Sequence, residues 1–384
     1  MVARAVRPRI YGWPSSPFTE KVVRYARFYE LSHELIVPTA WQLRGKITRA
    51  VGRAIMPTME LSTGRWIQDS SEIVDYLASQ IPHEGAFPSS PPQRLVSALL
   101  EYYADEWMPI MIMHTRWNTP ENRAFAEAEF ATTGLPWVPS PLAKRLVRPI
   151  AKKMASYRAV LGINEQSVPG VERRLGELLT QLDTHFAEVQ FLLGDAPCIG
   201  DFALCGPLYA HIHRDPGSRS RFKGLDHLCA WMGRLEGPPT RRFNFADDDE
   251  VPPTLEPILA SIFDEQWKFA SEVLRAVGRF ALESPGIPLP RGLGWAPCTV
   301  GGIETRRKIA TESQWKIQRV LEVYRQPWIC ESPLVESLLR RTNGEILKDL
   351  TVEQPVVRRR GKAHFLHQTN RADPVSPSPS SAED

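Results

Sequence analysis

Two adjacent hydroxyls stand where a short apolar strand passes into a helix near the start of the chain. Ser15 and Ser16 follow the strand-like residues that end at Tyr11, and Pro17 begins a helical pattern. The first turn of a helix presents free N–H groups and about half a positive charge, so it stabilises an anion. A hydroxyl beside it lowers the pKa of a bound thiol further. The stretch suits a thiolate, although the same residues also form an ordinary N-cap.

Two later positions could grip a peptide that carries such a thiol. Met56 and Pro57 precede a strand predicted at Thr58–Leu61. If their peptide bond is cis, the Met56 backbone turns outward and is free to pair with an extended ligand. A plain edge-strand proline is the alternative interpretation.

Asp69 and Ser70 stand where the next helix begins. A helix N-terminus and a hydroxyl suit a ligand's α-carboxylate, and the Asp69 carboxylate suits an ammonium group beside it. Asp69 and Glu72 also have the spacing of a capping box, which is the purely local interpretation.

The elements that must position these residues alternate over the first 80 residues. Hydrophobic periodicity and turn residues predict a small mixed sheet with helices, at Arg9–Tyr11, Phe18–Leu31, Glu34–Pro38, Thr58–Leu61, Arg65–Ile67 and Ser70–Ser79.

The rest of the chain is predicted to be mainly helical. Residues 92–245 form an all-α domain, and residues 251–350 form a helical extension that packs on it, interrupted by a loop at 284–302. Residues 354–384 are polar and rich in Pro and Ser, which predicts a disordered tail in which Arg358–Arg360 are solvated.

Composition narrows the class of protein. The 384 residues carry a net charge of only +3, so no nucleic-acid partner is expected, and the longest apolar run is too short for a membrane span. The five cysteines are scattered without a CxxC pair, which argues against a metal site or disulfide scaffold. No signal peptide is recognised, and we expect a cytoplasmic protein.

With these features in this order, the chain resembles the glutathione S-transferase family. The resemblance is carried by "SPF", "MPT" and "DSSEIVDYL" near the start, and by "FLLGDAPCIGDFAL" (191–204) and "HLCAWMGRLEGPP" (227–239) downstream. It covers roughly residues 8–245. It implies an α+β protein with a thioredoxin-like domain at 1–85 followed by the all-α domain, and a possible homodimer.

The resemblance also implies glutathione as co-substrate. Ser16 is the preferred residue for activating the sulfur, with Ser15 and Tyr11 as alternatives, and a cysteine-type enzyme is disfavoured because no cysteine precedes Cys198. The resemblance further implies that Met56 and Pro57 bind the backbone of the cysteinyl residue of glutathione. It implies that Asp69 and Ser70 bind the γ-glutamyl end, and that Arg44 or Lys46 binds the glycyl carboxylate. Asp201 is expected to close a capping box with Cys198.

A helix rich in aromatic residues and methionine would border the second substrate, although such a helix is more often simply core. Its candidate lining residues are Tyr103, Trp107, Met111, His114 and Trp117. The sequence thus predicts an enzyme that transfers glutathione to, or reductively cleaves, a small hydrophobic electrophile. The alternative is a non-catalytic protein of the same fold that binds glutathione or apolar ligands, or serves as an assembly module.

Overall fold

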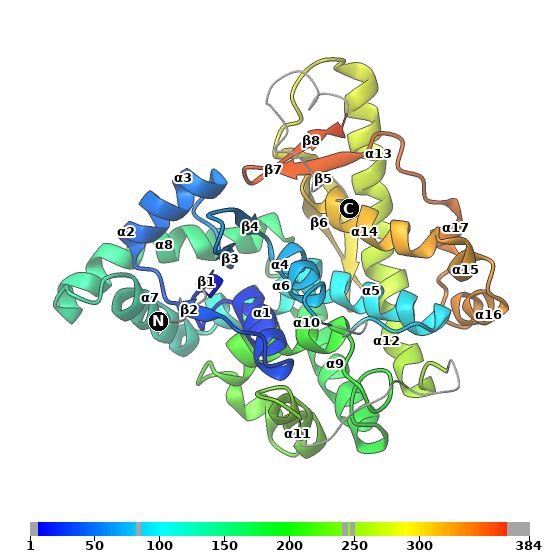
Figure 1. Cartoon of the computed structure of the whole chain (residues 1–384), viewed down its shortest axis with the longest axis horizontal. Helices are drawn as coiled ribbons and strands as arrows, with labels where there is room; N and C mark the ends of the chain where they lie inside the picture. Colours follow the sequence, from blue (N-terminus) through cyan, green and yellow to red (C-terminus); the bar gives the residue numbers. More distant parts are fainter. Residues whose placement is uncertain (1–6, 82–85, 240–244, 246–249, 367–384) are drawn as a thin grey trace, which may run out of the picture.

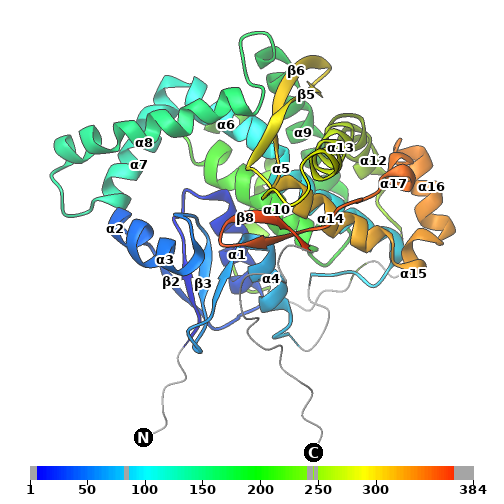
Figure 2. The same ribbon diagram turned by 90° about the horizontal axis from the view of Figure 1, so that it is seen from above.

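The computed structural model describes residues 7–81, 86–239, 245 and 250–366. A four-stranded sheet with helices comes first, a helical domain follows, and a helical extension with two β-hairpins ends the described chain (Figures 1 and 2). The predicted α+β architecture is confirmed. Among the described residues, no helix has the length and apolar character needed to span a bilayer.

The N-terminal sheet has the order β2-β1-β3-β4, with β2 parallel to β1 and the other pairs antiparallel. Successive side chains of a strand point to opposite faces. Ile10 therefore joins the large core under the long helices, while Tyr11 packs with Ile47 and Val51 on the other face. The elements are β1 (Arg9–Tyr11), α1 (Pro17–Phe28), β2 (Glu34–Ile36), α2 (Ala40–Gln42), η1 (Leu43–Ile47), α3 (Thr48–Val51), β3 (Thr58–Glu60), β4 (Trp66–Gln68) and α4 (Ser70–Ala78).

The helical domain packs on α1 through its most buried helix, α10 (Ile199–Pro207). A Cβ at Gly206 would lie only 2.3 Å from the carbonyl oxygen of Pro17, so glycine permits this close approach. The contact fixes the start of α1 against the domain. The other elements are α5 (Pro91–Glu106), α6 (Met108–Asn118), α7 (Pro120–Gly134), α8 (Ser140–Val160), α9 (Val168–Glu188), η2 (Leu208–His213), η3 (Arg219–Phe222) and α11 (Asp226–Arg234).

Asp201 anchors the beginning of α10. Its carboxylate accepts hydrogen bonds from the backbone N–H of Cys198 (2.8 Å) and of Leu192 (3.0 Å), and from the indole of Trp231 (2.8 Å). Since Asp201 is fully buried, these three donors replace the water that it loses. The expected contact between Asp201 and Cys198 is therefore present.

The extension packs against α5 through α14 (Ser313–Tyr324), α15 (Pro327–Cys330) and α16 (Pro333–Arg341). Its other elements are η4 (Pro253–Leu255), α12 (Glu256–Ser261), η5 (Ile262–Trp267), α13 (Lys268–Glu283), β5 (Gly292–Val300), β6 (Ile303–Ala310), α17 (Ile346–Asp349), β7 (Val356–Arg359) and β8 (Lys362–Phe365). The loop expected at 284–302 was partly wrong, because much of it is strand β5, paired with β6.

The disordered tail expected from residue 354 was wrong for residues 354–366. Strands β7 and β8 form a hairpin there, and its turn places Arg360 and Gly361 at φ 47° and 70°. Positive φ at both central residues is the geometry of a tight hairpin turn whose twist matches its strands. Buried Val356 and Phe365 hold the hairpin against α13. Residues 367–384 lie outside the described residues.

Candidate functional site

Three of the sequence-predicted segments meet at one cavity of about 220 Å³. Met56 and Pro57 line it ahead of β3, and their peptide bond is cis. Asp69 and Ser70 line it at the beginning of α4, and α1 reaches it through Phe18. The β3–β4 hairpin brings these segments together, since it places residue 57 and residue 69 at the same end of two paired strands.

Ser16 is the N-cap residue of α1. Its Oγ accepts a hydrogen bond from the backbone N–H of Thr19 at 3.3 Å, and Pro17 takes the first helical position. A hydroxyl that accepts one hydrogen bond can still donate another. Ser16 is half-buried and lies two residues before Phe18, which lines the cavity, but Ser16 itself is not among the lining residues.

Ser15 is buried, and the domain behind it holds its backbone. Its carbonyl oxygen accepts from Nε2 of His211 at 3.1 Å and from the guanidinium of Arg116 at 3.4 Å. Arg116 is itself buried and paired with Asp215. These contacts fix the backbone just before α1, which is a positioning role for residues of the helical domain.

The side chain of Tyr11 lies on the face of the sheet opposite to that of Ile10. Its hydroxyl donates to Glu60 at 2.7 Å and accepts from Lys46 at 2.7 Å, and its ring stacks on Trp66. Burial raises the pKa of Tyr11 above its ordinary value. Lys46 is thus engaged away from the cavity, and Arg44 is exposed on η1. Neither cation lines the cavity, so their expected contact with a glycyl carboxylate stays a prediction.

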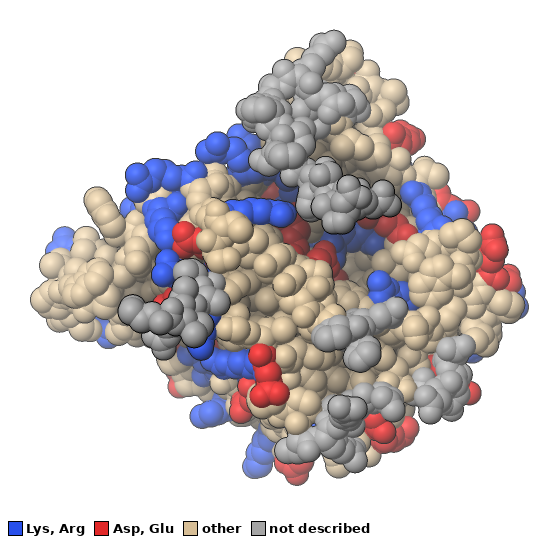
Figure 3. Space-filling model, in the orientation of Figure 1, with Lys and Arg blue, Asp and Glu red and all other residues tan. Residues whose placement is uncertain are grey.

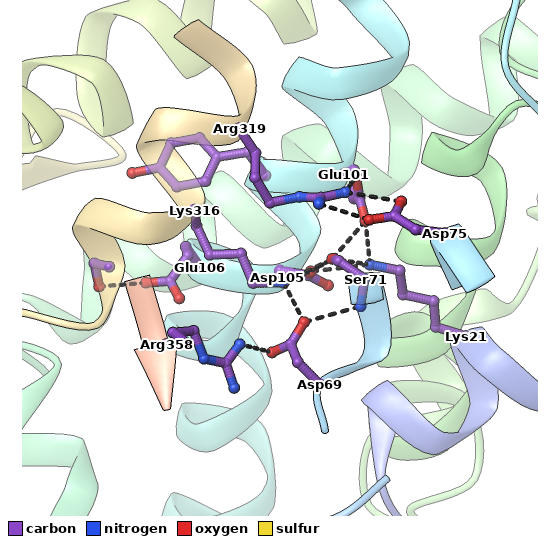
Figure 4. A network of polar contacts seen from close by, with 12 residues as sticks. Lys21, Asp69, Ser71, Asp75, Glu101, Asp105, Glu106, Lys316, Arg319 and Arg358 are labelled. Carbon is purple, nitrogen blue, oxygen red and sulfur yellow. Dashed lines mark hydrogen bonds and ion pairs between the residues drawn. The ribbon is translucent and has the colours of Figure 1, made fainter. Parts of the chain in front are cut away.

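Asp69 adopts a positive φ of 83° and caps α4 by accepting from the backbone N–H of Ser71 at 2.9 Å. Such a conformation is unfavourable for a residue with a side chain and is typical of positions held by their surroundings. Here two cations of the extension hold it (Figure 4): Lys316 on α14 at 3.0 Å and Arg358 on β7 at 2.6 Å. Although burial raises the pKa of Asp69, these two cations outweigh it and keep that pKa well below its ordinary range.

A buried network of charged side chains connects Asp69 and its two cations to the N-terminal domain, the helical domain and the extension. Asp105 on α5 accepts from Lys21 of α1 at 2.9 Å and from Lys316 at 2.7 Å. Lys21 also donates to Glu101 at 2.7 Å. Acidic and basic side chains gather accordingly in the hollow between α4 and α14 (Figure 3). The network as drawn in Figure 4 also contains Ser71, Asp75 and Arg319.

The expectation of a solvated Arg358–Arg360 run was therefore wrong for Arg358, whose side chain is only 8% exposed. Sequence reasoning also missed Lys316. Both residues follow Asp69 by more than 240 positions, and no local pattern marks either as its partner.

Comparison with known protein families identifies two segments of the chain. Residues 15–80 match the model described as "Glutathione S-transferase, N-terminal domain", and residues 144–239 match "Glutathione S-transferase, C-terminal domain". Each of these two segments therefore belongs to a glutathione S-transferase domain. No curated protein sequence matches the chain.

Several solved structures resemble this one at low identity. The chain is 16% identical to the beta-etherase LigF from Sphingobium sp. strain SYK-6, over 60% of this chain and 95% of that one, with a TM-score of 0.41. It is 16% identical to a glutathione S-transferase from Sinorhizobium meliloti 1021 (66% and 93%, TM-score 0.40) and 15% identical to FzlA from C. crescentus (66% and 92%, TM-score 0.40). Sequence identities and TM-scores as low as these support no conclusion about the activity of this chain.

The five residues proposed to border a second substrate lie in the core of this glutathione S-transferase fold. Each is at most 5% exposed, and none of them lines the cavity at Pro57 and Asp69. Two are fixed by acidic partners, since His114 lies 2.6 Å from Glu172 and the indole of Trp107 donates to Glu265 at 3.4 Å. The five are Tyr103, Trp107, Met111, His114 and Trp117.

Glu72, one turn into α4, gives a prediction for the pH dependence of stability. Burial raises its pKa from 4.5 to about 7, although Arg358 acts in the opposite direction. The folded state therefore holds this proton more tightly than the unfolded chain, and Glu72 costs stability as pH rises from about 4.5 to about 7. We expect Glu72→Gln to raise the free energy of unfolding by about 1–3 kcal/mol near pH 8 and to change it little near pH 5.

Urea unfolding of both proteins at the two pH values measures this difference. A gain that is the same at both values would show that Glu72 is not the titrating group.

Proposed function

We propose that the chain is a glutathione transferase-like enzyme of the serine type. It binds glutathione along the cavity and activates its thiol for transfer to, or reductive cleavage of, a small hydrophobic electrophile. The observation that supports this most is the meeting of Met56–Pro57, Ser70 and the first turn of α1 around one cavity. The ligand would pair with the backbone at Met56, and its sulfur would lie toward Ser16.

The chemistry required of the protein is modest. The N-terminus of α1 and the Ser16 hydroxyl favour the thiolate over the thiol, because each interacts more strongly with the charged form. The thiolate then attacks the electrophile, a C–S bond forms, and the leaving group departs with its bonding electrons. Holding the two reactants together supplies much of the remaining acceleration.

Cysteine-based chemistry has little support in this chain. The first cysteine is Cys198, and both it and Cys205 are buried in α10 or at its cap. Burial raises the pKa of each thiol, which leaves little nucleophilic thiolate. A serine hydroxyl assisting the ligand's own sulfur is therefore favoured.

One observation favours the non-catalytic alternative. Asp69, the residue expected to receive the ammonium of glutathione, is already paired with Lys316 and Arg358. A protein that had lost turnover could use the same contacts to hold its extension in place.

Calorimetric titration with glutathione, together with turnover of a generic aryl halide, separates these functions. The enzyme should show both binding and turnover. Binding without turnover across a panel of electrophiles would favour the non-catalytic protein, and the absence of both would remove glutathione from the account.

A further inference from the structure

Every carboxylate that lines the cavity already has a partner within the chain. Asp69 and Asp105 are paired with cations, as described above. Glu106 accepts from the hydroxyl of Ser313 at 2.6 Å, and Glu312 accepts from Arg291 at 2.8 Å. A ligand cation entering this cavity would have to share these carboxylates with the donors that they already hold.

Two donors in the same cavity are in the opposite situation. Among the described residues, the Ser70 hydroxyl and the Nε of Arg358 are buried and have no hydrogen-bond partner. Ser70 is 2% exposed, and both residues line the cavity. Buried donors are nearly always satisfied in folded proteins, so this pair calls for a ligand acceptor. A carboxylate meets that need, because its two oxygens only accept.

We propose that this cavity binds a ligand's carboxylate end that has no ammonium group beside it, with Ser70 and Arg358 as its donors. The inference rests on the proposed function, because it concerns one end of the same thiol peptide. In glutathione the α-ammonium adjoins this carboxylate. Here the ammonium would meet Lys316 and Arg358, two like charges, and would find Asp69 already neutralised. The extension thereby selects an acyl thiol peptide in place of a γ-glutamyl one.

A matched pair of ligands tests this selection. Glutaryl-cysteinyl-glycine is glutathione without the α-amino group and is otherwise identical. Titrations of the full chain at neutral pH should show the glutaryl peptide binding about tenfold more tightly than glutathione, or better, a difference of about 1.4 kcal/mol. If glutathione binds as tightly or more tightly, the inference is wrong while the proposed function survives. If neither ligand binds, both are wrong.

Two single substitutions test whether the extension causes the preference for the glutaryl peptide over glutathione. Arg358→Gln removes one donor and one repelling charge, so the preference should fall to about threefold or less. Arg359→Gln is the matched control: it is the exposed neighbour on the same strand and should leave the preference unchanged.

Circular dichroism checks that both variants fold. Should Arg358→Gln not fold, Ser70→Ala replaces it and should weaken the glutaryl peptide about fivefold or more. An unchanged preference in the folded Arg358→Gln protein, or unchanged affinity in Ser70→Ala, would overturn the assignment.

Discussion

Replacing Asp105 by Asn should lower the free energy of unfolding by about 3–5 kcal/mol. Its carboxylate, 3% exposed, lies 2.9 Å from the Lys21 ammonium and 2.7 Å from that of Lys316. Without that charge, two ammonium groups remain buried with less opposing charge, and an uncompensated buried charge is costly. The substitution should also weaken the docking of the extension, because Lys316 connects α14 to the rest of the network.

Urea unfolding measures the loss, and hydrogen exchange of α14 and β7 reports on the docking of the extension. Asp264→Asn is the matched control, since Asp264 makes an exposed pair with Lys268 at 3.4 Å and should cost no more than about 0.5 kcal/mol. If the two variants are equally stable, the network does not hold the three parts of the chain together.

Replacing Ser16 by Ala should lower kcat/KM for an aryl halide about 10²-fold, the size of effect seen when one donor to a reacting anion is removed. The hydroxyl accepts from Thr19 and can still donate to sulfur, and that donated bond is stronger to a thiolate than to a thiol. Affinity for the peptide should change much less. Loss of the N-cap should cost about 1 kcal/mol of stability, which a folded variant tolerates.

Ser15→Ala and Tyr11→Phe are the controls for this assignment. Each removes one hydroxyl from a residue that the sequence offers as an alternative to Ser16 for activating the sulfur. Steady-state kinetics of the three variants, with ligand affinity measured in parallel, rank the candidates. A larger fall for Ser15→Ala or Tyr11→Phe would transfer the role to that residue, and equal losses of turnover and affinity in Ser16→Ala would give it a binding role only.

The N-terminal half of the site was predictable because its signals are local. An N-cap serine before Pro17 marks the beginning of α1, and an Asp–Ser pair after a short strand marks the beginning of α4. The buried helix with Asp201 near its start was recognised by its resemblance to a motif of the family, and Asp201 caps it through a similarly local contact. Such features depend on neighbours within about four residues, so one sequence contains all the information they need.

The rest of the site depends on contacts between distant residues. Arg358 lies in a polar, basic segment whose composition predicts disorder, yet Val356 and Phe365 bury one side of its hairpin. An Arg–Gly turn is a weaker hairpin signal than Asn–Gly, so the hairpin was not recognised. Lys316 on an amphipathic helix is indistinguishable in sequence from a surface lysine. Only the fold shows that it is buried between Asp69 and Asp105.

The pKa of the bound peptide's thiol tests the account most directly. Ultraviolet absorbance of the thiolate, followed during a pH titration of the saturated complex, should give a pKa below about 7.5, against about 8.5 for a free thiol. Ser16→Ala should return it toward the free value. A bound thiol that titrates as it does in free solution would contradict thiolate stabilisation at the start of α1.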